Sequence, residues 1–228
     1  ISLIAVIISK KPSNSKKTFG FQRSEVLAAL INGMTLMPIG LWIVFESFER
    51  YRHPRLIEST EMLVVAVVGL LTNALSLWIL HLPSKRNLNL QSVLFHIFGD
   101  LFSSIAVVLA AILIYYKSWV GLDPTVSIMV SVLILFWGIS TILKSTHILM
   151  ESTPKHLDLT EVQKAIQSTV PGCVSVHDIH VWEITQHEIM LTAHVITQEP
   201  LIGTLQAKAG DVAQLLKERF GIGHATFQ

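Results

Sequence analysis

Long apolar stretches without charged residues constrain this chain more than any other feature. Residues 26–45, 62–82 and 126–143 contain no Asp, Glu, Lys or Arg. Each has about the 20 residues that a helix needs to cross a hydrocarbon core of about 30 Å. Residues 93–116 form an equally long stretch, which is apolar apart from His96 and Asp100. The sequence therefore predicts an integral membrane protein with four whole helical spans.

The composition changes to that of a soluble domain at Glu151. We expect a transmembrane domain over residues 1–150 and a globular domain over residues 151–228. The globular part has the pattern helix, strand, strand, helix, strand, which predicts an α+β domain with a small antiparallel sheet and two helices on one face. Thr160 and Gln163 have the spacing of a capping box at the first helix. Gly221 is the expected stop of the second helix.

The loops between the spans predict the orientation of the chain in the membrane. Alternating loops hold nine Lys and Arg residues on one side and four on the other, the nine being Lys10, Lys11, Lys16, Lys17, Arg23, Lys85, Arg86, Lys144 and Lys155. By the positive-inside rule, these nine residues and the globular domain lie in the cytoplasm. Residues 1–9 are apolar but too short to cross a bilayer, so we expect them to be the end of a further helix that begins before Ile1.

His96 and Asp100 are the candidate functional residues of the membrane part. An aspartate at the centre of a span costs about 2.5–3.5 kcal/mol on insertion scales, so its presence needs a reason. Residues four apart share one helix face, and imidazole with carboxylate is a ligand set for zinc and related divalent ions. A zinc site needs four ligands, so the rest must come from another helix. The alternative is that the pair forms hydrogen bonds that hold the helices together.

Two histidines of the globular domain are expected to face each other. If the hairpin loop is centred on Thr185 and Gln186, His177 lies opposite His194 on one face of the sheet, with Cβ atoms about 5 Å apart. The alternation of the strand places His180 on the other face, where we expect a structural role. The other interpretation of the pair is two half-exposed strand histidines without a ligand.

Four motifs in this order resemble the cation diffusion facilitator family. They are TFGFQRSEVLAALING at residues 18–33, HIFGD at 96–100, VHDIHVW at 176–182 and LTAHV at 191–195, and the likeness is strongest to the bacterial zinc-exporting branch. The resemblance implies six transmembrane helices and a ferredoxin-like, metallochaperone-like cytoplasmic domain. It also implies a homodimer that exchanges zinc for protons. His96 and Asp100 match the ligand pair of the fifth helix, and the pair of the second helix would precede Ile1.

The resemblance implies further site residues. His177, His194 and His224 match a cytoplasmic metal site that an acidic residue after Gln228 would complete. Arg23 and Glu151 match a charge interlock that holds the membrane halves of the dimer near the hinge; their alternative role is snorkelling at the membrane interface. The loop at residues 10–23 lacks the ligands of a second metal site that the family often has there, and we expect no metal in it.

The resulting functional expectation is a zinc/proton antiporter of a bacterial inner membrane. Zinc is then both the transported substrate and a ligand of the cytoplasmic domain, and the partners are protons, membrane lipid and a second copy of the chain. We expect no enzyme activity, because no nucleophile–base arrangement or cofactor loop is visible, and no binding of nucleic acid. The alternative from another class is a membrane-bound zinc sensor whose cytoplasmic domain responds to zinc without transport.

Overall fold

The computed structural model describes residues 2–53, 59–81, 101, 104–109, 111–114, 116, 121–185, 188–198 and 202–228. The chain divides into two compact units. One consists of Ile1–Met34 together with Gly138–Gln228, and the other of Thr35–Trp137.

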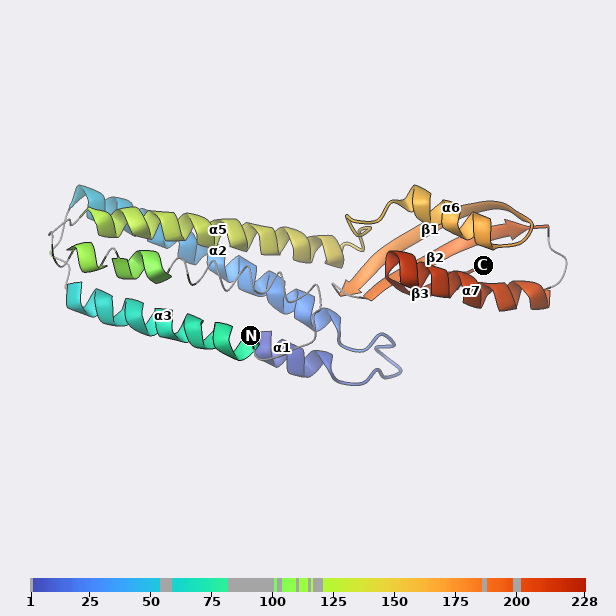
Figure 1. Ribbon diagram of the computed structural model, residues 1–228, viewed down its shortest axis with the longest axis horizontal. Coiled ribbons are helices and arrows are strands. Elements are labelled where there is room, and N and C mark those ends of the chain that lie inside the picture. The colour runs from blue at the N-terminus through green and yellow to red at the C-terminus, as the bar shows by residue number, and fades with distance from the viewer. Residues whose placement is uncertain are drawn as a thin grey trace. The chain divides into compact units, whose positions relative to one another are not determined.

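The N-terminal part is helical, as predicted from its apolar stretches. Its helices are α1 (Ser2–Ser9), α2 (Arg23–Arg52), α3 (Ser59–His81) and α5 (Leu122–Leu149) (Figure 1). Among the described residues, α2 and α5 are long and apolar enough to cross a membrane, and they contain the predicted spans 26–45 and 126–143. Helix α3 covers nearly all of 62–82. The described residues of 93–116 are helical, but His96 and Asp100 lie outside them.

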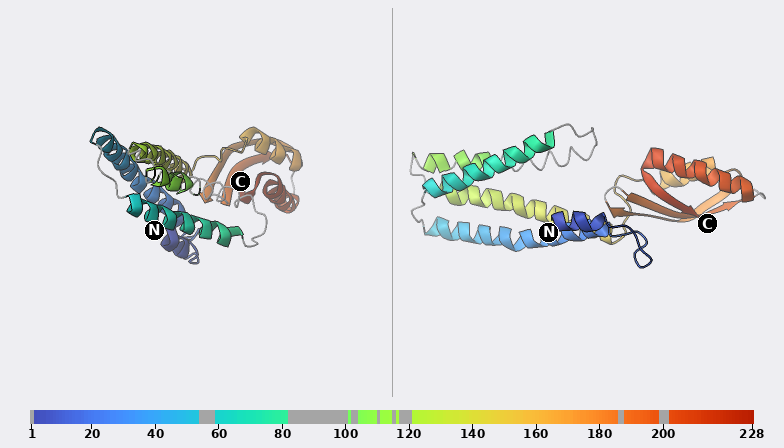
Figure 2. Two further views of the ribbon diagram at one scale, coloured as in Figure 1. Left: turned by 60° about the vertical axis from the view of Figure 1, so that its left-hand side comes forward. Right: turned by 90° about the horizontal axis from the view of Figure 1, so that it is seen from below.

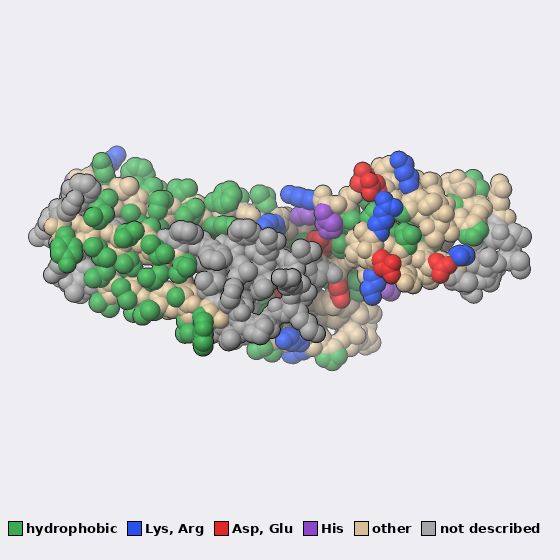
Figure 3. Space-filling view, in the orientation of Figure 1, with side chains coloured by type: hydrophobic (Ala, Val, Ile, Leu, Met, Phe, Trp, Pro, Cys, Tyr) green, Lys and Arg blue, Asp and Glu red, His purple; other side chains and the backbone are tan. Residues whose placement is uncertain are grey.

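The surface of the long helices agrees with a lipid environment. Trp42 and Phe45 on α2 and Phe136 on α5 have exposed fractions of 72%, 71% and 64%. On the face shown in Figure 3, hydrophobic side chains predominate over the long helices, whereas charged side chains gather over the C-terminal domain. Large apolar side chains in such numbers are stable on a protein surface only where lipid or another protein covers them.

Small residues allow α2 and α5 to approach closely. A Cβ atom added to Gly33 would lie 3.0 Å from Ile142 Cγ1 and 3.1 Å from the carbonyl oxygen of Gly138. Glycine is common at such contacts in membranes, because helices there associate by close packing.

An arginine at the end of α2 is neutralised within the second unit. Arg50 Nε lies 3.2 Å from Glu46 Oε1 on the same helix, and Arg50 Nη1 lies 3.3 Å from Asp123 Oδ2 in the first turn of α5. The Asp123 side chain is only 9% exposed. By the positive-inside rule, Arg50 lies on the side of the membrane where the loops contain few Lys and Arg residues. Its two carboxylate partners offset its charge there.

The C-terminal domain has the predicted order of elements. They are α6 (Leu159–Thr169), β1 (Cys173–Thr185), β2 (Glu188–Thr197), α7 (Ile202–Phe220) and β3 (Ile222–Phe227). The sheet has the order β1-β2-β3, and both helices cover one of its faces (Figure 2). We call the other side the open face. The predicted α+β class is confirmed, but the prediction of an all-antiparallel sheet is wrong, because β3 runs parallel to β2. Helix α7 returns the chain to the end of the sheet where β2 began, so the next strand runs in the same direction.

The core of this domain forms between the two helices and the sheet. Ile166 of α6, Leu216 of α7 and Ile222 of β3 are at most 1% exposed, and they belong to one hydrophobic cluster. Helix α7 ends at Phe220 as predicted, with Gly221 at a φ of 70° that favours glycine.

The start of α6 differs from the predicted capping box. The N-cap is Asp158, whose carboxylate accepts a hydrogen bond of 2.8 Å from the Thr160 backbone N–H. Gln163 does not reach back to the helix start, since its side chain donates to the carbonyl oxygen of Val176 at 2.7 Å. The prediction of Thr160 with Gln163 as a box is therefore wrong; Asp158 is an equally good capping residue two positions earlier.

Candidate functional site

The predicted membrane pair, His96 and Asp100, lies outside the described residues. A polar contact of the second unit lies next to it in sequence: Asn73 Nδ2 of α3 donates to Ser104 Oγ at 2.9 Å. Ser104 follows Asp100 by four residues. Hydrogen bonds of this kind join helices within membranes, so α3 contacts the segment that follows the candidate ligands.

The predicted pairing of the two sheet histidines is confirmed. His177 on β1 and His194 on β2 are directly opposite each other in the antiparallel ladder. Their ring centroids are 5.5 Å apart, and the ring planes are nearly perpendicular, at 85°. The predicted uniform register is wrong, however. The ladder shifts twice between the hairpin loop and His177, and only the part from Ser175 to His177 has the expected register.

One of these shifts is a β-bulge at Asp178, which changes the face of His180. Asp178 and Ile179 together oppose a single residue of β2, because His177 pairs with His194 and His180 with Thr192. Asp178 has a φ of 52°, a left-handed conformation that aspartate tolerates better than most residues. His180 thus lies on the same face as His177, and its predicted position on the opposite face is wrong.

The carboxylate of Asp178 lies between two imidazoles. Its Oδ1 is 3.0 Å from His180 Nε2, and its Oδ2 is 3.7 Å from His194 Nε2. All three side chains are partly exposed, with the Asp178 side chain at 53%. The open face therefore carries His177, His194, His180 and a carboxylate that can orient one of these rings.

His224 is not brought to this cluster. It lies in β3 opposite Met190, four residues along β2 from His194 and thus about 13 Å away along the strand. The position of β3 beside His194 is Gln228, whose backbone N–H donates to the Ala193 carbonyl oxygen at 3.0 Å. The structure therefore brings together two of the three histidines predicted for the cytoplasmic metal site.

The histidine pair offers two nitrogen ligands. Within the described residues, no group of three or more His, Cys, Asp or Glu side chains is arranged to hold a metal ion. Cys173 at the start of β1 is free, and burial raises the pKa of its thiol. Because the thiolate is the form that binds metal, this shift disfavours Cys173 as a ligand.

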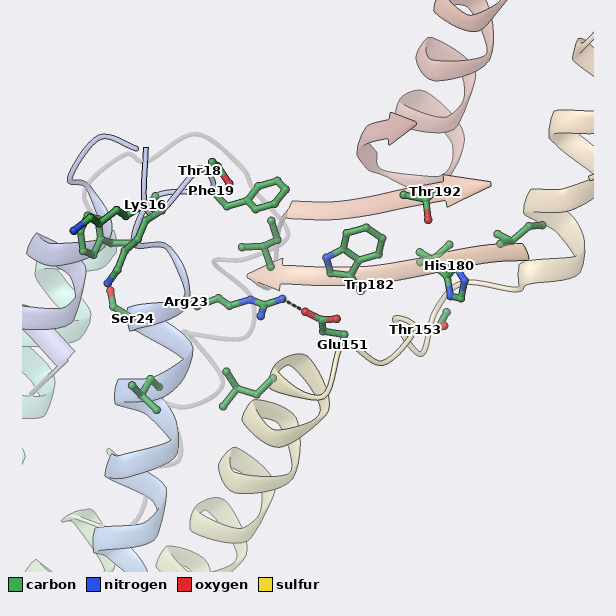
Figure 4. A pocket seen from close by; sticks show the side chains of 18 residues that line it. Lys16, Thr18, Phe19, Arg23, Ser24, Glu151, Thr153, His180, Trp182 and Thr192 are labelled. Atoms are coloured by element: carbon green, nitrogen blue, oxygen red, sulfur yellow. Dashed lines mark hydrogen bonds and ion pairs between the residues drawn. The ribbon is translucent and has the colours of Figure 1, made fainter. Parts of the chain in front are cut away.

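Arg23 and Glu151, the two residues predicted to belong to an interlock of the dimer, form an ion pair within one chain. Arg23 Nη2 at the start of α2 donates to Glu151 Oε1 at 2.8 Å (Figure 4). Glu151 follows the end of α5 and has a left-handed backbone, with a φ of 55°. The two side chains are 41% and 59% exposed, so the pair contributes no more than about 1 kcal/mol to stability. Its value is positional, since it ties the beginning of α2 to the connection that leads into the C-terminal domain.

The fold and these sites define a class: a helical membrane protein with a C-terminal α+β domain that exposes paired imidazoles. The comparisons with known proteins agree. The family model "Cation efflux transmembrane domain" matches residues 1–150, and the model "Cation efflux protein, cytoplasmic domain" matches residues 154–228. The chain belongs to the cation efflux family, also called the cation diffusion facilitators, and its C-terminal domain is cytoplasmic.

Individual relatives match over the whole of this chain. The cadmium, cobalt and zinc/H(+)-K(+) antiporter of Bacillus subtilis is 36% identical over 230 residues, which are 74% of that protein. The zinc transporter ZitB of Escherichia coli is 36% identical over 228 residues, 72% of its length. The metal cation efflux system protein CzcD of Cupriavidus metallidurans is 34% identical over 228 residues, also 72%.

Proposed function

We propose that this protein is a divalent metal cation/proton antiporter that exports zinc from the cytoplasm. The strongest support is that the family models of both domains, transmembrane and cytoplasmic, match this chain. Relatives named as zinc transporters and antiporters also match it over its full length. We place the boundary between the membrane and cytoplasmic domains at residues 150 and 151. The protein would act as a homodimer in a bacterial inner membrane, as a transporter and not as an enzyme.

The proposed transport site includes His96 and Asp100. Imidazole and carboxylate four residues apart can bind one ion from one helix face, and a second helix would supply the remaining ligands. Zinc needs the imidazole neutral and the carboxylate ionised, so zinc and protons compete for the same atoms. Alternating access around such a site would release zinc on the outside while outside protons take its place.

The cytoplasmic histidine pair is proposed as a second, regulatory metal site. Facing imidazoles with 5.5 Å between ring centroids suit zinc chemically, and the Asp178 carboxylate, 3.7 Å from His194 Nε2, places a negative charge beside the pair. Zinc normally has four ligands, so the histidine pair needs further ones. The end of β3 lies beside His194, and we expect the further ligands near it. His224 lies four residues before this end of β3, about 13 Å along the strand, so we assign it no place in the same site.

Zinc flux into proteoliposomes tests the transport proposal. The protein is reconstituted with a pH gradient, and zinc entry is followed with a trapped fluorescent indicator. We expect flux in the wild type and none in His96→Ala, Asp100→Ala or Asp100→Asn, since a neutral amide supplies no charge to offset the dication. His156→Ala, a surface histidine outside both sites, is the matched control. Flux that persists in all three site variants would reject the site, and zinc binding without any flux in the wild type would favour the sensor.

The regulatory proposal needs a protein without the membrane ligands. In a His96→Ala, Asp100→Ala background, calorimetry should detect zinc binding that disappears in His177→Ala, His194→Ala and persists in His156→Ala. In the otherwise wild-type protein, the same double substitution should reduce the flux without abolishing it. Unchanged zinc affinity after loss of both histidines would show that the pair binds no metal.

A further inference from the structure

A cavity of about 870 Å3 adjoins the Arg23–Glu151 pair, within the unit that contains the cytoplasmic domain (Figure 4). Its lining comes from the loop before α2, from the connection after α5 and from β1 and β2 of the cytoplasmic sheet. The volume is in the range of about 300–1,000 Å3 that is typical of ligand pockets. Neither proposed metal site uses this cavity, although His180 lies on its wall.

Positive charge exceeds negative charge in the lining. Lys16, Lys17 and Arg23 line the cavity, and Glu151 is the acidic residue among the described lining residues. Glu151 already binds Arg23 at 2.8 Å. In the part of the chain that the structure describes, neither lysine forms an ion pair with a carboxylate; Lys17 Nζ lies 4.3 Å from the centre of the Phe21 ring. Two ammonium groups are therefore left for an anion from outside the protein.

The lysines belong to a compact loop with a fixed backbone. The side-chain oxygen of Asn14 accepts hydrogen bonds from the backbone N–H groups of Lys16 and Lys17, at 3.0 and 2.8 Å. The backbones of Asn14 and Lys17 also exchange hydrogen bonds of 3.1 and 3.0 Å. Gly20, with a φ of 70°, packs against the loop start, where an added Cβ would lie 3.6 Å from the Lys11 carbonyl oxygen. The backbone positions of both lysines are thus set before a ligand arrives, so binding does not have to order the loop.

The other end of the lining is apolar and continues onto a membrane helix. Leu27 lies in the second turn of α2, is 50% exposed and lines the cavity, as does Phe19, which is 56% exposed. Because α2 begins at Arg23 and its charge-free stretch begins at Val26, we expect Leu27 where the headgroup region meets the hydrocarbon. A soluble anion would satisfy the lysines and leave this apolar end in water. An amphiphile with an anionic head would satisfy both ends.

We propose that the cavity binds one anionic phospholipid of the cytoplasmic leaflet. Its phosphate pairs with Lys16 and Lys17, and its acyl chains follow the surface of α2 from Leu27. The headgroup also meets Trp182 of β1, so a bound lipid contacts both the start of a membrane helix and the cytoplasmic sheet. The proposal depends on the orientation of the family in the membrane and not on zinc transport.

Competition between lipids and inorganic phosphate tests the site. The protein in uncharged detergent, freed of native lipid, is titrated in parallel with phosphatidylglycerol, phosphatidylcholine and inorganic phosphate, and bound molecules are counted by native mass spectrometry. The test variant is Lys16→Gln, Lys17→Gln. Lys10→Gln, Lys11→Gln is the matched control, because it removes the same charge from the same loop outside the cavity lining. Lys16→Arg, Lys17→Arg keeps the charge at the site.

We expect the wild type to prefer phosphatidylglycerol to phosphatidylcholine. Lysines near a membrane surface contribute about fivefold each to anionic-lipid affinity, so the test variant should lose about 30-fold while the control and the arginine variant stay near the wild type. Equal losses in both glutamine variants would show an effect of overall loop charge and overturn the site. Equal affinity for the two lipids, or displacement of the lipid by phosphate at similar concentration, would also overturn it. Because none of these variants alters His96 or Asp100, loss of zinc flux and loss of lipid binding can be told apart.

Discussion

Gly33 has no room for a methyl group where α2 meets α5. A Cβ atom added there would lie 3.0 Å from Ile142 Cγ1 and 3.1 Å from the Gly138 carbonyl oxygen. Carbon atoms in contact are normally about 3.5–4.0 Å apart. Ile142 can change its rotamer, but the Gly138 carbonyl is backbone and cannot rotate away. We therefore expect Gly33→Ala to push the two helices apart at this point.

The size of the effect follows from two opposing contributions. Overpacking of this kind costs about 1–3 kcal/mol. Alanine also removes the penalty of glycine in a helix, about 1 kcal/mol, so a net loss of about 0–2 kcal/mol remains. In a chain of this length, 1 kcal/mol corresponds to about 2–4 °C, so the apparent melting temperature should fall by up to about 8 °C. Gly33→Ala should melt below a variant in which alanine replaces a helix glycine that has open space around it, because that variant gains the helix propensity without the clash.

Two other glycines provide matched controls in the same assay. Gly69 in α3 has no atom within 4 Å of an added Cβ, so Gly69→Ala should leave the melting temperature unchanged or raise it. At Gly40 the added Cβ would lie 2.7 Å from Leu135 Cδ2, the end of a flexible side chain, and the loss should be smaller than at Gly33. The assay is the loss of the monodisperse peak in detergent after heating. Equal melting of Gly33→Ala and Gly69→Ala would refute the reasoning.

Three further substitutions test other contacts. Arg50→Ala should destabilise the protein by about 1–3 kcal/mol, because the Asp123 carboxylate, 9% exposed, loses its guanidinium partner; melting in detergent measures this, and Arg50→Lys should recover part of it. Asp158→Ala should lower the unfolding temperature of the cytoplasmic domain at pH 7, and by progressively less as the pH falls below about 4. The Thr160 hydrogen bond lowers the pKa of Asp158, so this stabilisation is complete above the ordinary carboxyl pKa of about 4 and is lost as the pH falls and the group protonates. Leu216→Ala should cost about 2–5 kcal/mol and speed hydrogen exchange in β2, since the side chain is fully buried; unchanged exchange would contradict its place in the core.

The parts of the fold that follow from hydrophobic pattern could be predicted from the sequence. The charge-free stretches predicted the membrane helices, and the alternation of apolar residues predicted the strands. Both patterns are visible in the sequence because apolar side chains are removed from water in every such element. The pairing of His177 with His194 was also predictable. It was reached through a uniform register that the ladder does not have, since two shifts intervene between the loop and the pair.

The features that escaped prediction depend on single backbone choices. Nothing in the residue types around Asp178 requires a bulge, yet one extra residue reverses the alternation and moves His180 to the open face. At α6, Asp158 and Thr160 are both good caps, and tertiary contacts decide between them, because Gln163 is used by the Val176 carbonyl. The direction of β3 depends on the length of α7 and of its connections, which hydrophobic periodicity does not report.

The bulge at Asp178 also determines where β1 can tolerate a change in chain length. If Asp178 were deleted, His177 would still pair with His194 and His180 with Thr192, and Ile179 alone would face the residue between them. The strand would become regular, with every core side chain still directed at the helices. An insertion or deletion within the regular stretch from His180 to Glu183 would instead turn the side chains at one end of the strand to the opposite face. Relatives whose β1 differs in length by one residue should therefore carry the gap at this position. A variant that lacks Asp178 should fold, whereas a variant that lacks one residue of the regular stretch after His180 should not.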